Sequence, residues 1–193
     1  MNLNLVKQLR EKTGASVLEC QKALNETKGD LGKAEEILRK KGQKIVVNKA
    51  GRITKSGLLG VYLHSNEKIA AIVEVNCETD FVARNSEFKE LAHDLAMQAA
   101  ATNPLYLKPE DVPADVLAKE KEIYQVELKK EKKPEQIINK IIEGKLEKYF
   151  QANCLIKQPF IKDDKITIDD LVKAKIAKIG ENIQVKRFIR FEI

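Results

Sequence analysis

The sequence predicts an α+β fold in which a small helical domain precedes a larger domain that mixes strands and helices. Three observations predict it. Residues 1–50 carry apolar side chains at helical spacing, with a set of capping signals for each of three short helices. From Ile53 the pattern changes to short β-branched runs that are typical of strands. Two long charged segments with helical spacing then follow, on either side of Pro134.

The first two helices are predicted from one apolar face and two capping signals. Leu5, Val6 and Leu9 share a helical face, and Gly14 follows at a position that suits the left-handed residue after a helix. Residues 16–19 have the S-x-x-E form of a capping box, which predicts that a second helix starts there.

A third helix is predicted to begin after Asp30 and to end at Gly42. Residues 44–52 are then expected to form a tether. The predicted domains are residues 1–52, comprising the helices and the tether, and residues 53–193. Three short helices make a small core, so the first domain is expected to be only marginally stable alone.

Spacing alone leaves two interpretations of the helical domain open. It could be a helix-turn-helix that reads DNA or a helical module that binds peptides. Acidic side chains among the lysines disfavour DNA, because they would lie beside phosphates. These are Glu19, Glu26, Glu35 and Glu36.

A β-hairpin and a helix are predicted next. Residues 58–63 and 69–75 are short apolar runs separated by the polar residues 65–68. Residues 86–101 place apolar side chains at helical spacing, with Ser86 as the expected cap and Pro104 beyond the end. This helix is expected to pack across the hairpin.

The segments 114–133 and 135–150 predict a helical hairpin that turns at Pro134. The second segment carries a continuous apolar stripe. The basic cluster at residues 129–133 is interpreted as a solvated face, with an RNA-binding tip as the alternative.

The chain ends in a strand expected near residues 154–160, a helix over 169–179 and an alternating strand over 183–191. A strand edge exposed near the last segment needs cover, so a symmetric dimer through the α+β core is expected.

Composition indicates a folded, soluble protein. Of 193 residues, 43% are hydrophobic and 33% are charged, which is too apolar for a disordered chain. No apolar run approaches the roughly 20 residues that cross a bilayer, and the N-terminus lacks the features of a signal peptide. We therefore expect a cytoplasmic protein without a membrane role.

The cysteines and histidines do not form a recognisable catalytic or metal-binding motif. Cys20, Cys77 and Cys154 include no C-x-x-C pair and are interpreted as reduced and structural. His64 and His93 lie in no ligand-spaced cluster and are interpreted as partly buried surface residues. We expect no catalytic residue, no metal ligand and no cofactor. An enzyme that pairs Cys77 with a histidine is the disfavoured alternative.

The net charge of +6 indicates attraction to an acidic partner, either RNA or an acidic protein surface. The net charge is +5 over residues 1–50 (11 basic and 6 acidic), −2 over residues 51–150 and +3 over residues 151–193. This concentration at the two ends is the basis of the rival hypothesis, an RNA-binding or ribosome-binding protein that uses its basic terminal segments.

Two motifs resemble the elongation factor Ts family. Residues 9–15 (LREKTGA) with 20–24 (CQKAL) are similar to its N-terminal signature, and residues 74–82 (EVNCETDFV) match a more specific motif. Weaker agreements continue at residues 158–160, 180–182 and 187–188, so the resemblance spans nearly the whole chain.

The resemblance implies a small ubiquitin-associated-like helical domain followed by an antiparallel α+β dimerisation-type core with a helical hairpin over about 114–150. It also implies a function: a guanine-nucleotide exchange factor that promotes release of GDP from elongation factor Tu so that GTP can bind. Such a factor is not an enzyme and requires no direct contact with nucleic acid.

The resemblance further implies two binding elements. Arg10, Val17 and Leu18 are carried over as contacts with the GTPase domain of the partner. Residues 79–82 (Thr79, Asp80, Phe81 and Val82) are carried over as the element that wedges against the partner near its nucleotide and magnesium site. From the residues alone, Phe81 could instead be a core residue, and Asp80 is expected to cap the short turn that follows.

The chain departs from the family pattern in two respects. Many members have glycine followed by two methionines where this chain has Ser16, Val17 and Leu18, which replaces adaptable thioethers with branched side chains. The chain also resembles the compact members with one core unit, and a homodimer could supply the second.

Overall fold

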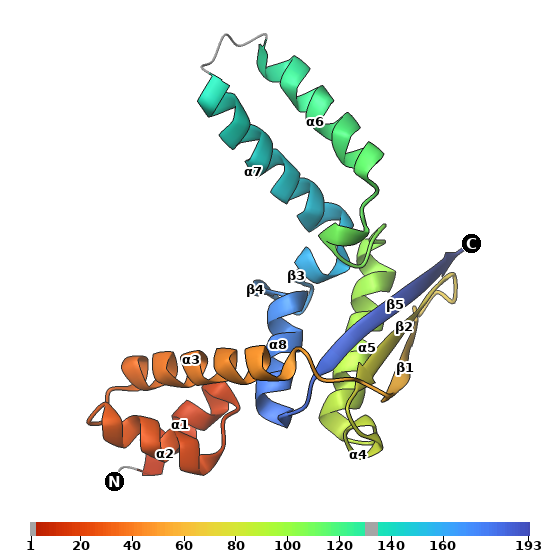
Figure 1. The fold of residues 1–193 in the computed structure, drawn as a ribbon. Helices are drawn as coiled ribbons and strands as arrows, with labels where there is room; N and C mark the ends of the chain where they lie inside the picture. The colour runs from red at the N-terminus through yellow and green to blue at the C-terminus, as the bar shows by residue number, and fades with distance from the viewer. Residues whose placement is uncertain (1–2, 130–134) are drawn as a thin grey trace. The chain divides into compact units, whose positions relative to one another are not determined.

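The computed structural model describes residues 3–129 and 135–193 and contains both helices and strands, which confirms the α+β prediction (Figure 1). The chain divides into two compact units. Unit 1 comprises Met1–Gly57, Asn76–Phe88 and Val172–Gln184, and unit 2 comprises Leu58–Val75, Lys89–Leu171 and Val185–Ile193. The domain boundary expected at residue 52 and the ubiquitin-associated-like assignment stay predictions.

Within unit 1, the helices α1 (Leu3–Thr13), α2 (Val17–Glu26) and α3 (Leu31–Lys49) pack around one small core. The core consists of Val6, Leu9, Cys20, Ala23, Leu24, Ala34 and Leu38.

The predicted capping signals of these helices are present. Gly14 has a φ of +66° and donates its N–H to the Arg10 carbonyl at 2.8 Å. Ser16 and Glu19 form the reciprocal capping box of α2, and the Asp30 side chain accepts from the Lys33 N–H at the start of α3.

The prediction that Gly42 ends the third helix is wrong, because α3 continues to Lys49. Gly42 is not among the residues with positive φ, so it does not adopt the left-handed conformation that ends a helix. A Cβ at Gly42 would lie 3.3 Å from the Ala177 Cβ of α8 (Ile168–Ile179), which explains a small residue in the helix interior. The predicted tether therefore shortens to the residues after Lys49.

Unit 2 contains most of a three-stranded sheet in the order β1-β2-β5. The strands are β1 (Ser56–Leu63), β2 (Ile69–Cys77) and β5 (Ile183–Glu192), and β1 and β2 form the predicted hairpin. Helix α5 (Ser86–Thr102) covers one face of this sheet (Figure 1). The buried side chains of β2 are Ala71, Val73, Val75 and Cys77, and those of α5 include Phe88, Leu91 and Leu95.

Helix α5 lies very close to the sheet at Gly60. A Cβ built at this residue would overlap the Ala92 carbonyl oxygen, so only glycine lets α5 lie this close to β1. At the other edge of the sheet, the Arg190 Nε of β5 donates to the Ala100 carbonyl at 2.9 Å.

The predicted helical hairpin is formed by α6 (Ala114–Lys129) and α7 (Glu135–Asn153), which pack against each other (Figure 1). The Lys145 ammonium lies 4.9 Å from the ring centroid of Tyr124 and pairs with Glu127 of α6. Pro134 and most of the basic cluster predicted as a solvated face lie at residues 130–134, outside the described residues.

The strand expected over residues 154–160 is shorter than predicted. Leu155–Lys157 forms a 3₁₀ turn (η2), and only Pro159–Phe160 (β3) pairs as a strand, antiparallel to β4 (Asp163–Thr167). The buried Gln98 side chain explains this irregular backbone: its amide donates to the Pro159 carbonyl at 3.1 Å and accepts the Ile161 N–H at 3.0 Å.

The remaining short helices are α4 (Asp80–Ala83) and the 3₁₀ turn η1 (Pro109–Asp111). The three cysteines are free and buried, which agrees with their interpretation as reduced and structural. Both histidines are exposed rather than partly buried.

Gly60→Ala is expected to destabilise the protein by at least about 3 kcal/mol, because the new methyl group forces α5 away from β1. Chemical denaturation monitored by circular dichroism measures the change. Gly144→Ala is the matched control: nothing lies within 4 Å of a Cβ at this residue of α7, so we expect a gain of about 0.5–1 kcal/mol. Equal stability of the two variants would show that α5 does not require the glycine.

Candidate functional site

Residues 78–85 connect the end of β2 to the start of α5 and contain the whole predicted binding element. After Glu78 and Thr79, the chain makes the single helical turn α4. The structure therefore brings Thr79, Asp80, Phe81 and Val82 together on one turn.

Thr79, not Asp80, caps this turn. Thr79 has extended backbone angles (φ −127°, ψ 159°), and its hydroxyl oxygen accepts the Val82 N–H at 3.4 Å. Asp80 is the first helical residue, and it pairs with Arg84 at 2.9 Å. The prediction for Asp80 was wrong by one position because a threonine hydroxyl and an aspartate carboxylate are both good caps. A carboxylate in the first turn still favours the helix.

The start of α5 differs from prediction in the same way. Asn85 accepts the Glu87 N–H through Oδ1 at 2.8 Å, and Ser86, the expected cap, is the first helical residue. An asparagine or a serine satisfies the free amides at a helix start, so the sequence alone did not decide between them.

Phe81 is 82% exposed, so the alternative that it is a core residue is wrong. The buried residue of this region is Cys77, whose thiol donates to the Thr79 carbonyl at 3.1 Å. Burial raises the pKa of the Cys77 thiol, and the nearby Glu181 carboxylate raises it further. The thiol is thus kept neutral beneath the turn.

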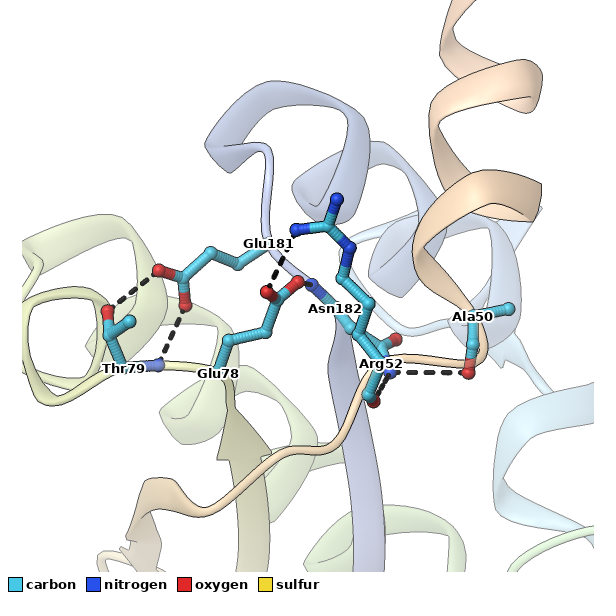
Figure 2. Close-up of polar contacts among 6 residues, drawn as sticks. All are labelled: Ala50, Arg52, Glu78, Thr79, Glu181 and Asn182. Carbon is cyan, nitrogen blue, oxygen red and sulfur yellow. Dashed lines mark hydrogen bonds and ion pairs between the residues drawn. The ribbon is translucent and has the colours of Figure 1, made fainter.

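Two glutamates hold the base of the turn (Figure 2). Glu181 lies just after Gly180, the left-handed residue (φ +81°) that follows α8, and its carboxylate accepts two hydrogen bonds from Thr79. These come from the Thr79 N–H to Oε2 at 3.0 Å and from the Thr79 hydroxyl to Oε1 at 2.7 Å. In return, Glu78 accepts the Asn182 N–H at 2.7 Å. We call Glu78, Thr79, Glu181 and Asn182 the turn network.

The turn network also holds the segment that follows α3. Asn182 is buried, and its side-chain amide donates to the Arg52 carbonyl at 2.8 Å and to the Ala50 carbonyl at 3.4 Å. The Arg52 guanidinium donates to Glu78 Oε2 at 3.2 Å. The Asn182 N–H lowers the pKa of the Glu78 carboxyl, and Arg52 lowers it further.

Sequence reasoning missed Glu181 and Asn182 as site residues. Both residues belong to the weak family agreement at residues 180–182, which implies no role for them. The one local signal is Gly180, which marks a reversal after α8 but does not reveal what the next two side chains contact.

The second predicted binding element lies in unit 1, on α1 and α2. Arg10 is exposed near the end of α1, and Val17 and Leu18 begin α2 with 44% and 59% of their surface exposed. The capping box fixes the start of α2, so these two apolar side chains are held in solvent rather than in the small core.

Within residues 3–129 and 135–193, no group of three or more His, Cys, Asp or Glu side chains is arranged to hold a metal ion. A helix long and apolar enough to cross a membrane is also not found in the described part of the chain.

The family model described as "Elongation factor TS" matches residues 3–193. The chain belongs to the elongation factor Ts family. Members of this family are guanine-nucleotide exchange factors for elongation factor Tu, and this function extends to the chain described here.

Curated relatives with the name "Elongation factor Ts" align along the whole chain. The protein from Thermotoga petrophila is 56% identical over all of this chain and 96% of its own length. The Moorella thermoacetica protein is 53% identical over 97% of this chain and 93% of its own length. The Carboxydothermus hydrogenoformans protein is 51% identical over 98% and 87%.

The depressed pKa of Glu78 predicts a pH-dependent contribution to stability. Because the folded pKa lies below the ordinary value of 4.5, Glu78 stabilises the folded state above pH 4.5. This stabilisation is lost as the pH falls from 4.5 through the folded pKa. The free energy of unfolding of the unaltered chain should therefore exceed that of Glu78→Gln at pH 7, and the difference should shrink towards pH 3. A difference that is constant with pH would mean that the charge of Glu78 is not involved.

Proposed function

We propose that the chain promotes GDP release by pressing the turn of residues 79–82 against the GTPase domain of elongation factor Tu, near its nucleotide and magnesium site. The observation that carries this proposal is the 82% exposure of Phe81 on a turn held by hydrogen bonds at its base. A large aromatic side chain held in solvent is typical of an interface anchor, because anchors gain their binding energy by leaving water.

Exchange requires no covalent chemistry. The factor binds the nucleotide-free partner more tightly than the nucleotide-bound one, and by linkage the factor and the nucleotide weaken each other's binding equally. The factor, elongation factor Tu and GDP form a ternary complex, and GDP leaves this complex faster than it leaves elongation factor Tu alone. In this proposal the chain is not an enzyme in the usual sense, uses no cofactor, requires no nucleic acid and acts in the cytoplasm, where translation takes place.

Arg10, Val17 and Leu18 are proposed as a second contact with the GTPase domain. Their exposure supports this role, since two neighbouring apolar side chains in solvent are available for burial by a partner. Arg10 adds a positive charge that favours an acidic surface.

RNA or ribosome binding through the basic terminal segments is the rival proposal. Ion pairs in the first three helices weigh against it, because they offset part of the positive charge that would contact phosphates. Lys12 pairs with Glu35 at 2.9 Å, and Lys40 pairs with Glu36 at 2.8 Å.

A homodimer is proposed through the sheet face opposite α5. Gly60 lies on the α5 face, so alternation places its neighbours on the other face. The exposed apolar side chains are Leu59, Val61 and Leu63 on β1 and Ile189 and Phe191 on β5, with exposed fractions of 49–61%. An apolar patch on one self-complementary face is what a two-fold dimer buries.

Phe81→Ala is expected to raise the half-saturating concentration for GDP release by at least about tenfold, as for central aromatic anchors. The maximal rate should also fall if the ring acts while GDP leaves. Release of labelled GDP from a cognate elongation factor Tu, with and without this protein, measures both. Stability should change by no more than about 0.5 kcal/mol, because the side chain is exposed.

Leu105→Ala is the matched control for Phe81→Ala. Leu105 is 61% exposed and lies outside both proposed contacts, so its truncation should not alter exchange. Normal exchange by Phe81→Ala would defeat the proposed role of the turn. Salt-dependent retention of RNA at concentrations that give no GDP release would instead support the rival.

Val61→Asp is expected to weaken self-association at least about a hundredfold, because it places a charge on the apolar sheet face. Sedimentation equilibrium should show particles of twice the 21.8 kDa chain mass for the unaltered protein and single chains for the variant. Ser65→Asp, in the exposed loop between β1 and β2, is the control. A particle of 21.8 kDa at every concentration of the unaltered protein would refute the dimer.

A further inference from the structure

We propose that Glu181 is a positioning residue for nucleotide exchange, which acts by fixing Thr79 so that the following turn presents Phe81 to the partner. This inference rests on the proposed function and assigns part of it to a residue that is distant in sequence from the turn.

The need for such a residue follows from the size of α4. A helix of four residues has too few internal hydrogen bonds to be stable by itself, since helix nucleation is unfavourable. Phe81 contributes little to the stability of the turn, because the residue is 82% exposed. The conformation of the turn therefore depends on contacts at its base.

Glu181 supplies two such contacts to one residue. Its two carboxylate oxygens accept the N–H and the hydroxyl hydrogen of Thr79, at 3.0 and 2.7 Å (Figure 2). Hydrogen bonds to a charged acceptor are roughly twice as strong as neutral ones, so the pair restrains both the backbone and the side chain of Thr79.

The hydrogen bond that the Thr79 hydroxyl donates to Glu181 also orients the hydroxyl oxygen as the cap of α4. A hydroxyl has one hydrogen to donate and two lone pairs to accept with. Because the hydrogen points at Glu181, a lone pair remains for the Val82 N–H, which lies 3.4 Å away. Glu181 thereby orients the cap that closes the turn carrying Phe81.

Glu181 is itself held by the rest of the turn network. Glu78 accepts the Asn182 N–H, while Glu181 accepts the Thr79 N–H, so residues 78–79 and 181–182 are joined reciprocally. Each segment provides one carboxylate and one backbone amide to the other. This reciprocal arrangement fixes the distance between the segments better than one bond would.

Positioning by Glu181 differs from simple stabilisation of the fold in its dependence on Phe81. A positioning residue acts through the side chain it presents, so its removal should matter little once that side chain is gone. A residue that only stabilises the fold would have the same effect with or without Phe81.

The experiment measures GDP release from a cognate elongation factor Tu over a range of concentrations for four proteins: the unaltered chain, Glu181→Gln, Phe81→Ala and the double variant. Glutamine has only one side-chain oxygen, so it cannot accept the two Thr79 hydrogens on separate oxygens as the Glu181 carboxylate does. Glu181→Gln should raise the half-saturating concentration by about three- to tenfold, because the competent turn is less populated. In the Phe81→Ala background the same change should have an effect of less than about twofold.

Two further measurements support this comparison. Hydrogen exchange of the Val82 and Ala83 amides in the free protein should be faster in Glu181→Gln. Thr79→Val removes the hydroxyl but leaves the Glu181 carboxylate, and it should also raise the half-saturating concentration for GDP release. This variant takes the place of Glu181→Gln if that protein folds poorly. Glu147→Gln is the matched control, because it removes a carboxylate from a surface ion pair with Lys157 at 3.1 Å outside the turn network.

The outcomes distinguish the two proposals. If the unaltered chain does not release GDP, the proposed function fails and this inference fails with it. If the unaltered chain is active but Glu181→Gln is unchanged, or is equally impaired in both backgrounds, only the positioning role is overturned. The inference is supported by a loss that depends on Phe81 and is accompanied by faster amide exchange in the turn.

Discussion

The close contact of α5 with the sheet fixes the helix and the strand between which the proposed binding turn is connected. Gly60 lets the Ala92 carbonyl lie against β1, and Arg190 of β5 bonds the Ala100 carbonyl further along the same helix. With α5 docked in this way, residues 78–85 must connect the buried end of β2 to the first residue of the helix. A short connection between two elements has few conformations, so the length of this segment already limits its backbone.

Packing does not, however, determine the conformation within the turn. Phe81 is the largest side chain there, and it contributes little burial that could hold it. Polar contacts take this role instead: Thr79 caps α4, Asp80 pairs with Arg84, and Glu181 holds Thr79. Exposed apolar surface costs free energy in water, and the cost is recovered only when a partner covers it. An exposed aromatic on a hydrogen-bonded base is therefore understandable as a binding element.

Elements with a local signal could be predicted from the sequence, whereas contacts across the chain could not. The capping box at Ser16 and the hairpin of β1 and β2 follow from spacing, and both are present. The predicted end of α3 at Gly42 was wrong because the sequence does not distinguish a glycine inside a helix from a glycine that follows one. The distinction depends on a spatial neighbour, here Ala177. The motif at residues 74–82 predicts a binding element at residues 79–82 by resemblance, but Glu181 bonds Thr79 across 102 positions and no local pattern encodes that contact.

The carboxylates of the turn network fit the proposal that this surface exists both in water and beneath a partner. Burying a carboxylate is costly unless its oxygens are hydrogen-bonded. All four oxygens of the pair have a donor within the chain: Asn182 and Arg52 for Glu78, and the two Thr79 groups for Glu181. A partner that covers the turn can thus remove water without leaving a carboxylate oxygen unsatisfied. The same bonds order the turn before binding, so less conformational entropy is lost when Phe81 docks.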